Sequence, residues 1–160
     1  SKILEVEDEG NSYLGVVVKV DEERDAAVIV VGSTKLPVAA VASEPVNVGD
    51  DLFVAGAPVH LENRGMLTKG VVSKIGPFHG TDFIHMDAAI DRGNSGGPVF
   101  NGHGELVGIS VGGQLSSDGT LGHIGLAIPL AEFLESVQVR DSRSTAPKAL
   151  SGASGSEPAA

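Results

Sequence analysis

Short runs of β-branched and aliphatic residues recur along the chain, with turn-forming residues between them. Residues 13–32, YLGVVVKVDEERDAAVIVVG, contain two such runs, which predict strands at 14–20 and 26–31 joined by a charged turn. After Pro45 and the Gly49–Asp50 turn, a third run predicts a short strand at 52–56. The pattern is that of consecutive strands linked by short turns.

Four later segments continue the pattern: GMLTKGVVSKIG, TDFIHMDAA, GGPVFNGHGELVGISVGG and LGHIGLAIP. The NGHG stretch at 101–104 predicts a hairpin turn. Helical spacing is found only in PLAEFLESVQV, where one face carries Leu130, Phe133, Leu134 and Val137. Pro129 suits the start of that helix. The chain is therefore predicted to be all-β with one late helix.

The last segment, residues 140–160, is rich in Ser, Ala, Gly and Pro and has no apolar periodicity. Burial of such a segment cannot offset its ordering entropy. We expect a disordered tail or linker.

Composition narrows the classes of partner. The net charge is −10 and no Lys/Arg-rich run is present, which argues against a nucleic-acid partner. The longest apolar runs are too short to span a bilayer, so no membrane insertion is expected. The chain has no cysteine and no H-x-x-x-H pair, so neither a zinc site nor another cofactor is predicted.

One serine stands among three glycines in DRGNSGGPVF, residues 91–100. Gly93, Gly96 and Gly97 remove side-chain bulk on both sides of the Ser95 hydroxyl. In a tight turn the backbone N–H groups of Gly93 and Ser95 can point into one small space and form an oxyanion hole. An ordinary Gly-rich β-turn is the alternative reading of these residues alone.

The surroundings of this motif resemble a known family. FIHMDAAIDRGNSGGPVFNGHGELVGISVGG followed by GHIGLAIP is similar to the C-terminal barrel of HtrA/Deg-type serine proteases, which have the trypsin fold. The earlier segments DEERDAAVIVV, VNVGDDLFVAGAPV and LTKGVVSKIG also fit the family's order. The resemblance implies a double β-barrel: residues 1–43 a remnant of the first barrel, residues 44–139 a complete second barrel with the helix.

The resemblance also implies roles for individual residues. Ser95 would be the nucleophile, Gly93 and Ser95 would supply the oxyanion hole, and Asp25 would be the triad aspartate, although Asp25 alone reads as a solvated turn charge. Substrate would be bound by Ile90, Ser110, Val111, Gly112, Gly113 and Leu126. These residues are small or apolar, so cleavage after small aliphatic residues is expected. Asn94, the residue before the nucleophile, is neutral and cannot form an ion pair with an N-terminal ammonium group inserted into the fold. Activation by such an insertion is therefore not expected.

The family's base, a histidine in a Thr-Ala-x-His-Val type motif, has no match in the chain. His60, His79, His85 and His103 read as surface or strand residues, and His123 is the only one expected near Ser95. Three hypotheses follow: a serine endopeptidase whose base lies upstream of the supplied residues, an inactive trypsin-fold module that binds extended peptides, or a chain completed by a second polypeptide. A peptide or unfolded protein is the expected partner, with a homo-oligomer or a complementing chain as further options. The resemblance suggests that the protein is located in the cell envelope or in an organelle.

Overall fold

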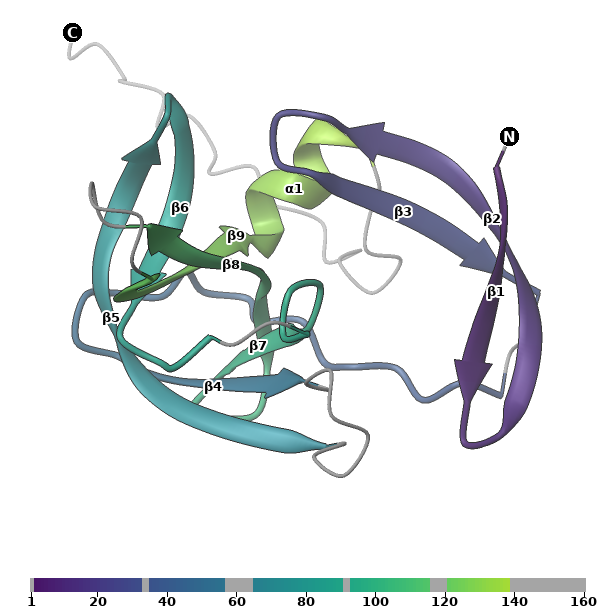
Figure 1. Cartoon of the computed structure of the whole chain (residues 1–160), viewed down its shortest axis with the longest axis horizontal. Helices are drawn as coiled ribbons and strands as arrows, with labels where there is room; N and C mark the ends of the chain where they lie inside the picture. The colour runs from purple at the N-terminus through teal and green to yellow at the C-terminus, as the bar shows by residue number, and fades with distance from the viewer. Residues whose placement is uncertain (1, 33–34, 57–64, 91–92, 116–120, 139–160) are drawn as a thin grey trace, which may run out of the picture.

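The computed structural model describes residues 2–32, 35–56, 65–90, 93–115 and 121–138. The N-terminal strands β1 (Ile3–Asp8), β2 (Asn11–Asp21) and β3 (Ala26–Val31) form one antiparallel sheet in the order β1-β2-β3. Figure 1 shows this sheet beside, and separate from, the remaining strands. The two predicted strands are confirmed here. The strand β1 was not predicted, although its acidic and apolar residues alternate as in a half-buried strand.

The later strands close into a barrel. β4 (Asp51–Gly56), β5 (Met66–Phe78), β6 (Thr81–Met86), β7 (Pro98–Asn101), β8 (Leu106–Leu115) and β9 (Leu121–Pro129) follow the order β4-β5-β6-β9-β8-β7 around it. All neighbouring pairs in the barrel are antiparallel. The NGHG segment lies between β7 and β8, as the hairpin prediction required. A closed barrel plus an open sheet confirms the predicted all-β fold with one complete barrel.

The helix α1 (Leu130–Ser136) follows β9 directly, with Pro129 as its N-cap residue. Leu130, Phe133 and Val137 are buried and Leu134 packs against the same cluster. The predicted apolar face is therefore confirmed, while the helix ends earlier than the periodicity suggested. Residues 139–160 lie outside the described part of the chain, so the predicted tail stays a prediction.

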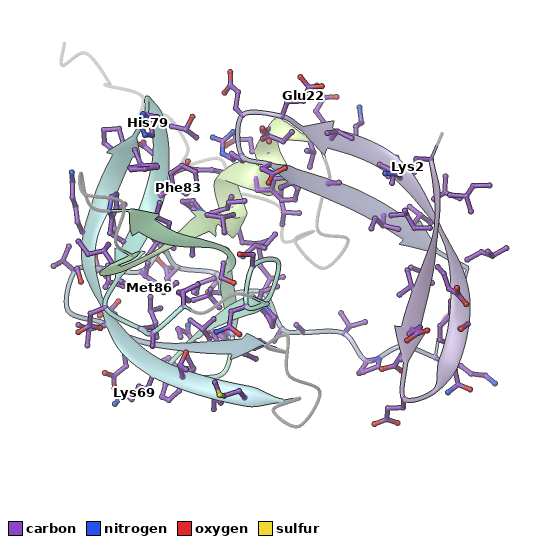
Figure 2. All side chains as sticks on the ribbon, in the orientation of Figure 1. Lys2, Glu22, Lys69, His79, Phe83 and Met86 are labelled. Atoms are coloured by element: carbon purple, nitrogen blue, oxygen red, sulfur yellow. The ribbon has the colours of Figure 1, made fainter. Side chains whose placement is uncertain are left out.

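Two apolar clusters build the core. One fills the barrel and is made of aliphatic side chains from several strands: Leu52, Val54, Val72, Ile84, Met86, Ala88, Val99, Val107 and Ala127. The other joins α1 to the barrel through Phe83, Leu126 and Ile128, and the partly buried Ala26 and Val28 of β3 pack against it. Figure 2 shows the side chains around Met86 inside the barrel, with Lys69 at its outer edge. The helix thus packs against both the barrel and the sheet.

The N-terminal sheet leaves large apolar side chains in contact with solvent. Leu14 is 72% exposed and Ile3 65% exposed. The chain continues from β3 through a segment in which Val41 forms a parallel bridge with Leu106 of β8. None of the described helices is long and apolar enough to cross a membrane.

A polar contact ties the β2–β3 turn to α1. Asp21 accepts hydrogen bonds from the backbone N–H of Arg24 (3.1 Å), its guanidinium (3.0 Å) and the hydroxyl of Ser136 (3.0 Å). The guanidinium also lies 3.8 Å from the carboxylate of Glu132. Burial raises the pKa of Asp21, but the hydrogen bonds from Arg24 and Ser136 lower it by more, so the net pKa lies below its ordinary value.

This shift predicts an acid-sensitive contribution to stability. Because the folded pKa of Asp21 is depressed, its contribution is present above the unfolded pKa of about 3.9 and is lost as the pH falls through the folded value. We expect Asp21→Asn to lower the free energy of unfolding by about 1 kcal/mol at neutral pH and by less at pH 3. Urea unfolding at both pH values measures this, with exposed Asp82→Asn as control; equal losses for both variants would contradict it.

Candidate active site

Ser95 lies in a turn that leads into β7 and leaves it exposed. Gly93 and Gly96 on either side have φ angles of 102° and 86°, in the left-handed region that favours glycine. Asn94 between them is only 2% exposed, whereas Ser95 and Gly96 are exposed. The glycines thus allow a tight turn that leaves Ser95 exposed, as the sequence led us to expect.

Hydrogen bonds attach this turn to β8. The N–H of Gly96 donates to the carbonyl of Ser110 (2.6 Å), and the N–H of Ser110 donates to the carbonyl of Gly97 (2.9 Å). The Asn94 carbonyl accepts from the N–H of Gly97 (2.9 Å) and from the Ser110 hydroxyl. Ser110 is fully buried. The turn is thus held on its inner side by one residue of β8.

The side chain of Asn94 occupies the space beside Gly56, the last residue of β4. A Cβ at Gly56 would overlap the Asn94 amide, so only glycine leaves room for it there. The Asn94 Oδ1 atom is buried without a hydrogen-bond partner among the described residues. The neutral side chain of Asn94 is therefore held by packing against β4 and not by an ion pair.

Gly112 is brought next to the serine. A Cβ on Gly112 would stand 3.6 Å from the Ser95 Oγ, and Gly112 itself has a φ of 112°. The β8–β9 register shifts between Ser110 and Gly112, so Val111 forms a bulge at this point. Bulges redirect a strand locally. The bend brings the predicted peptide-binding edge beside the serine at Gly112.

The other predicted substrate residues are more buried. Leu126 is 5% exposed and belongs to the cluster around α1, and Val111 packs against the same cluster. Ile90 packs against the barrel core and lies against Gly125, which has no side chain to displace it. The structure describes the backbone but not the side chains of residues 113–115 and 121–123, and residues 116–120 lie outside the described part of the chain.

Asp25 lies in the N-terminal sheet and not in the barrel that carries Ser95. It is exposed in the β2–β3 turn, has a φ of 52°, and follows Arg24, which is tied to α1. Among the described contacts none joins Asp25 to the Ser95 turn. Its assignment as the triad aspartate stays a prediction.

Two histidines are engaged elsewhere. The Nε2 atom of His85 lies 3.2 Å from the carbonyl of Gly76, and His79 packs edge-on against Phe78 with ring centroids 4.3 Å apart. His103 lies in the β7–β8 turn, where its backbone N–H donates to the Asn101 Oδ1 atom. His60 and the side chain of His123 lie outside the described residues. In the described ranges no three His, Asp or Glu side chains gather into a metal-binding group.

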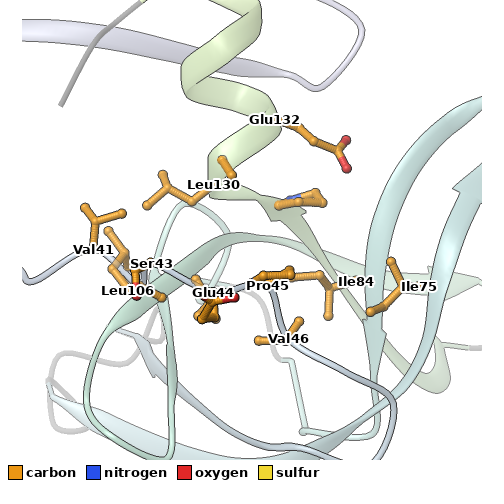
Figure 3. Close-up of a pocket in the computed structure, with 14 residues that line it drawn as sticks. Val41, Ser43, Glu44, Pro45, Val46, Ile75, Ile84, Leu106, Leu130 and Glu132 are labelled. Carbon is orange, nitrogen blue, oxygen red and sulfur yellow. The ribbon is translucent and has the colours of Figure 1, made fainter. Parts of the chain in front are cut away.

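An apolar pocket of about 340 Å³ lies apart from these residues (Figure 3). It is formed by the segment at 41–46, by β5 and β6, and by the beginning of α1. Among the described residues, Glu44 and Glu132 are the charged ones that line it. The described lining includes none of the predicted catalytic, oxyanion-hole or substrate residues.

The hydrogen bonds of Ser110 and the fit of Asn94 beside Gly56 were not predicted. Ser110 was predicted only as a substrate-binding residue, and Asn94 only as a neutral residue before the nucleophile. Asn94 and Ser110 are 16 positions apart, and a hydrogen bond across that separation depends on how β7 and β8 pair. A small polar residue within the otherwise apolar strand LVGISV is the one signal that pointed to a buried polar partner.

Comparison with known proteins supports one family. Residues 1–109 match the family described as a trypsin-like peptidase domain. HhoA of Synechocystis sp. (strain ATCC 27184 / PCC 6803 / Kazusa), named as a serine protease, is 36% identical over 141 residues, which cover 81% of this chain and 34% of HhoA. A DegP-like periplasmic serine endoprotease, as it is named, of Chlamydia trachomatis serovar D is 37% identical over 127 residues, covering 76% of this chain and 25% of that protein.

Solved structures agree. The HtrA-type protease AlgW with a decapeptide matches at a TM-score of 0.71 and 32% identity, over 81% of this chain and 41% of that one. AlgW S227A with a tripeptide matches at a TM-score of 0.70 and 32% identity, over 44% of its chain. The chain thus spans a quarter to a third of the two curated relatives described above. With its glycine-flanked serine and closed barrel, this chain belongs to the trypsin-like peptidases and, within them, to the HtrA/Deg-like proteases.

Proposed function

We propose that the chain is the nucleophile-bearing part of an HtrA-like serine endopeptidase. The observation that carries this proposal is the exposed Ser95, held in a turn whose inner side is bonded to β8. The Ser95 Oγ attacks a peptide carbonyl carbon, the amine leaves with a proton, and water then hydrolyses the acyl-enzyme. The N–H groups of Gly93 and Ser95 stabilise the oxyanion during both steps.

The general base is the family's histidine, whose motif has no match in this sequence. Asp25 orients that histidine. A nucleophilic serine needs a base to remove its proton, which is worth about 10²–10⁴ in rate. Without that base, we expect Ser95 to react only slowly. A complementing segment or chain would restore turnover.

Extended peptides or unfolded proteins are the proposed substrates. The backbone of Gly112 lies beside the Ser95 Oγ and offers an edge for pairing with an extended peptide. Ile90 and Leu126 are aliphatic and bring no acidic group to attract Lys or Arg. Cleavage after small aliphatic residues follows.

Chemical rescue tests the proposal on the chain itself. Fluorophosphonate labelling, followed by intact mass, is expected to form one adduct on Ser95, and added imidazole should accelerate it about tenfold or more by acting as the absent base. Ser95→Ala should abolish the adduct, whereas Ser12→Ala, which removes an exposed serine of β2, should not. Peptide phosphonates ending in Val should label faster than those ending in Lys.

A chain that shows no Ser95 adduct at any imidazole concentration would contradict the proposed nucleophile and favour the peptide-binding module. Labelling that is rapid and indifferent to imidazole would show that the chain contains its own base. In that case the assignment of the base to another segment is wrong.

A further inference from the structure

The turn around Ser95 uses its backbone groups unequally. The N–H groups of Gly96 and Gly97 both point inward, the first to the carbonyl of Ser110 and the second to the carbonyl of Asn94. The peptide between Asn94 and Ser95 has its carbonyl on the same inner side, where it also accepts the Ser110 hydroxyl. All three groups face the buried side of the turn.

Planarity of this peptide sets the direction of the remaining N–H group. In a trans peptide the carbonyl and the N–H point in opposite directions. Since the Asn94 carbonyl points toward buried Ser110, the N–H of Ser95 points away from it, toward the exposed side of the turn. Ser95 is the one residue after Asn94 in this turn whose N–H is directed outward by these bonds.

We propose that Ser110 is a positioning residue, whose hydroxyl fixes the Asn94–Ser95 peptide so that the Ser95 N–H is presented to a substrate oxyanion. This inference rests on the proposed function, because it assigns an orientation to a donor of the proposed oxyanion hole. One backbone bond, from the Gly97 N–H, also holds the Asn94 carbonyl, but that bond lies within the turn and does not tie the carbonyl to β8. The backbone bonds of Ser110 connect it to Gly96 and Gly97, whereas the hydroxyl is the only group of Ser110 that reaches the Asn94 carbonyl.

Ser110 holds the main-chain carbonyl of Asn94, while Gly56 makes room for the Asn94 side chain. A donor held in place before substrate binds requires no rearrangement as negative charge develops on the carbonyl oxygen. Ser110 thereby preorganises the turn.

Residue-resolved amide hydrogen exchange by NMR separates positioning from general stability. Ser110→Ala and Ser110→Cys both remove the strong hydroxyl donor and leave the backbone bonds of residue 110 in place. We expect exchange of the Gly97 N–H, which bonds the Asn94 carbonyl, to accelerate at least about tenfold, since that carbonyl loses its tie to β8. The Gly96 N–H, which bonds the backbone of residue 110, should keep its protection.

The core variant Leu52→Ala serves as control, because loss of stability alone should accelerate exchange of both amides in parallel. A parallel change in the Ser110 variants, or no change at Gly97, would overturn the proposal; Ser110→Cys decides if Ser110→Ala does not fold. Fluorophosphonate labelling with imidazole should fall about tenfold in the same variants. If Ser95 is unlabelled even in the unsubstituted chain while Gly97 alone responds, the positioning role stands and the proposed function fails.

Discussion

Gly97→Ala is expected to abolish fluorophosphonate labelling of Ser95 and to lower the free energy of unfolding by about 1–3 kcal/mol. A Cβ at Gly97 would overlap the backbone carbonyl of Ala55 in β4 and stand 2.8 Å from the carbonyl of Asn94. Both are main-chain atoms, so neither can rotate away as a flexible side chain would. The added methyl group must push the turn off the barrel.

Gly102→Ala is the matched control, because Gly102 has no atom within 4 Å of the added Cβ and lies in the β7–β8 turn of the same barrel. Its stability should stay within about 0.5 kcal/mol of the unsubstituted chain. Urea unfolding and intact mass measure the two effects separately. A Gly97→Ala chain with undiminished stability and labelling would show that the turn can leave β4 without consequence for Ser95.

Leu52→Ala is expected to cost about 2–5 kcal/mol of stability, the largest loss among the substitutions considered. Leu52 is fully buried in β4, where it pairs with Gly70 of β5 and Asn101 of β7. Its side chain fills the middle of the barrel cluster, and truncation leaves a cavity that closely packed neighbours cannot fill. Since Leu52 contacts no group of the Ser95 turn by hydrogen bonding, labelling of the folded fraction should be retained.

Leu67→Ala provides the comparison, because Leu67 lies on the neighbouring strand β5 and is 60% exposed. The same truncation there should change stability by less than about 1 kcal/mol. The two midpoints of urea unfolding measure the difference directly. Similar losses for both leucines would mean that the barrel interior repacks freely around β4.

Much of the fold could be predicted from local pattern. The strand β3 begins and ends where a β-branched run meets turn residues, and the helix face at Leu130 and Phe133 follows from 3.6-residue spacing. These features depend on neighbours in sequence, which propensity and periodicity describe. The position of Ser95 in an exposed turn belongs to the same class, since Gly93 and Gly96 need glycine for their own backbone angles.

The local pattern of residues is enough to predict the all-β character, the helix, the glycine-flanked serine and, through its motifs, the resemblance to HtrA/Deg-like proteases. The groups that surround that serine depend instead on the folded barrel: Ser110 beneath the Asn94 carbonyl, Gly56 beneath the Asn94 side chain, and Gly112 beside the Ser95 hydroxyl. These partners come from β8 and β4, far away along the chain. Their contacts exist only when the register of the closed barrel brings them together, and a pairing register is a property of the whole barrel rather than of any one segment.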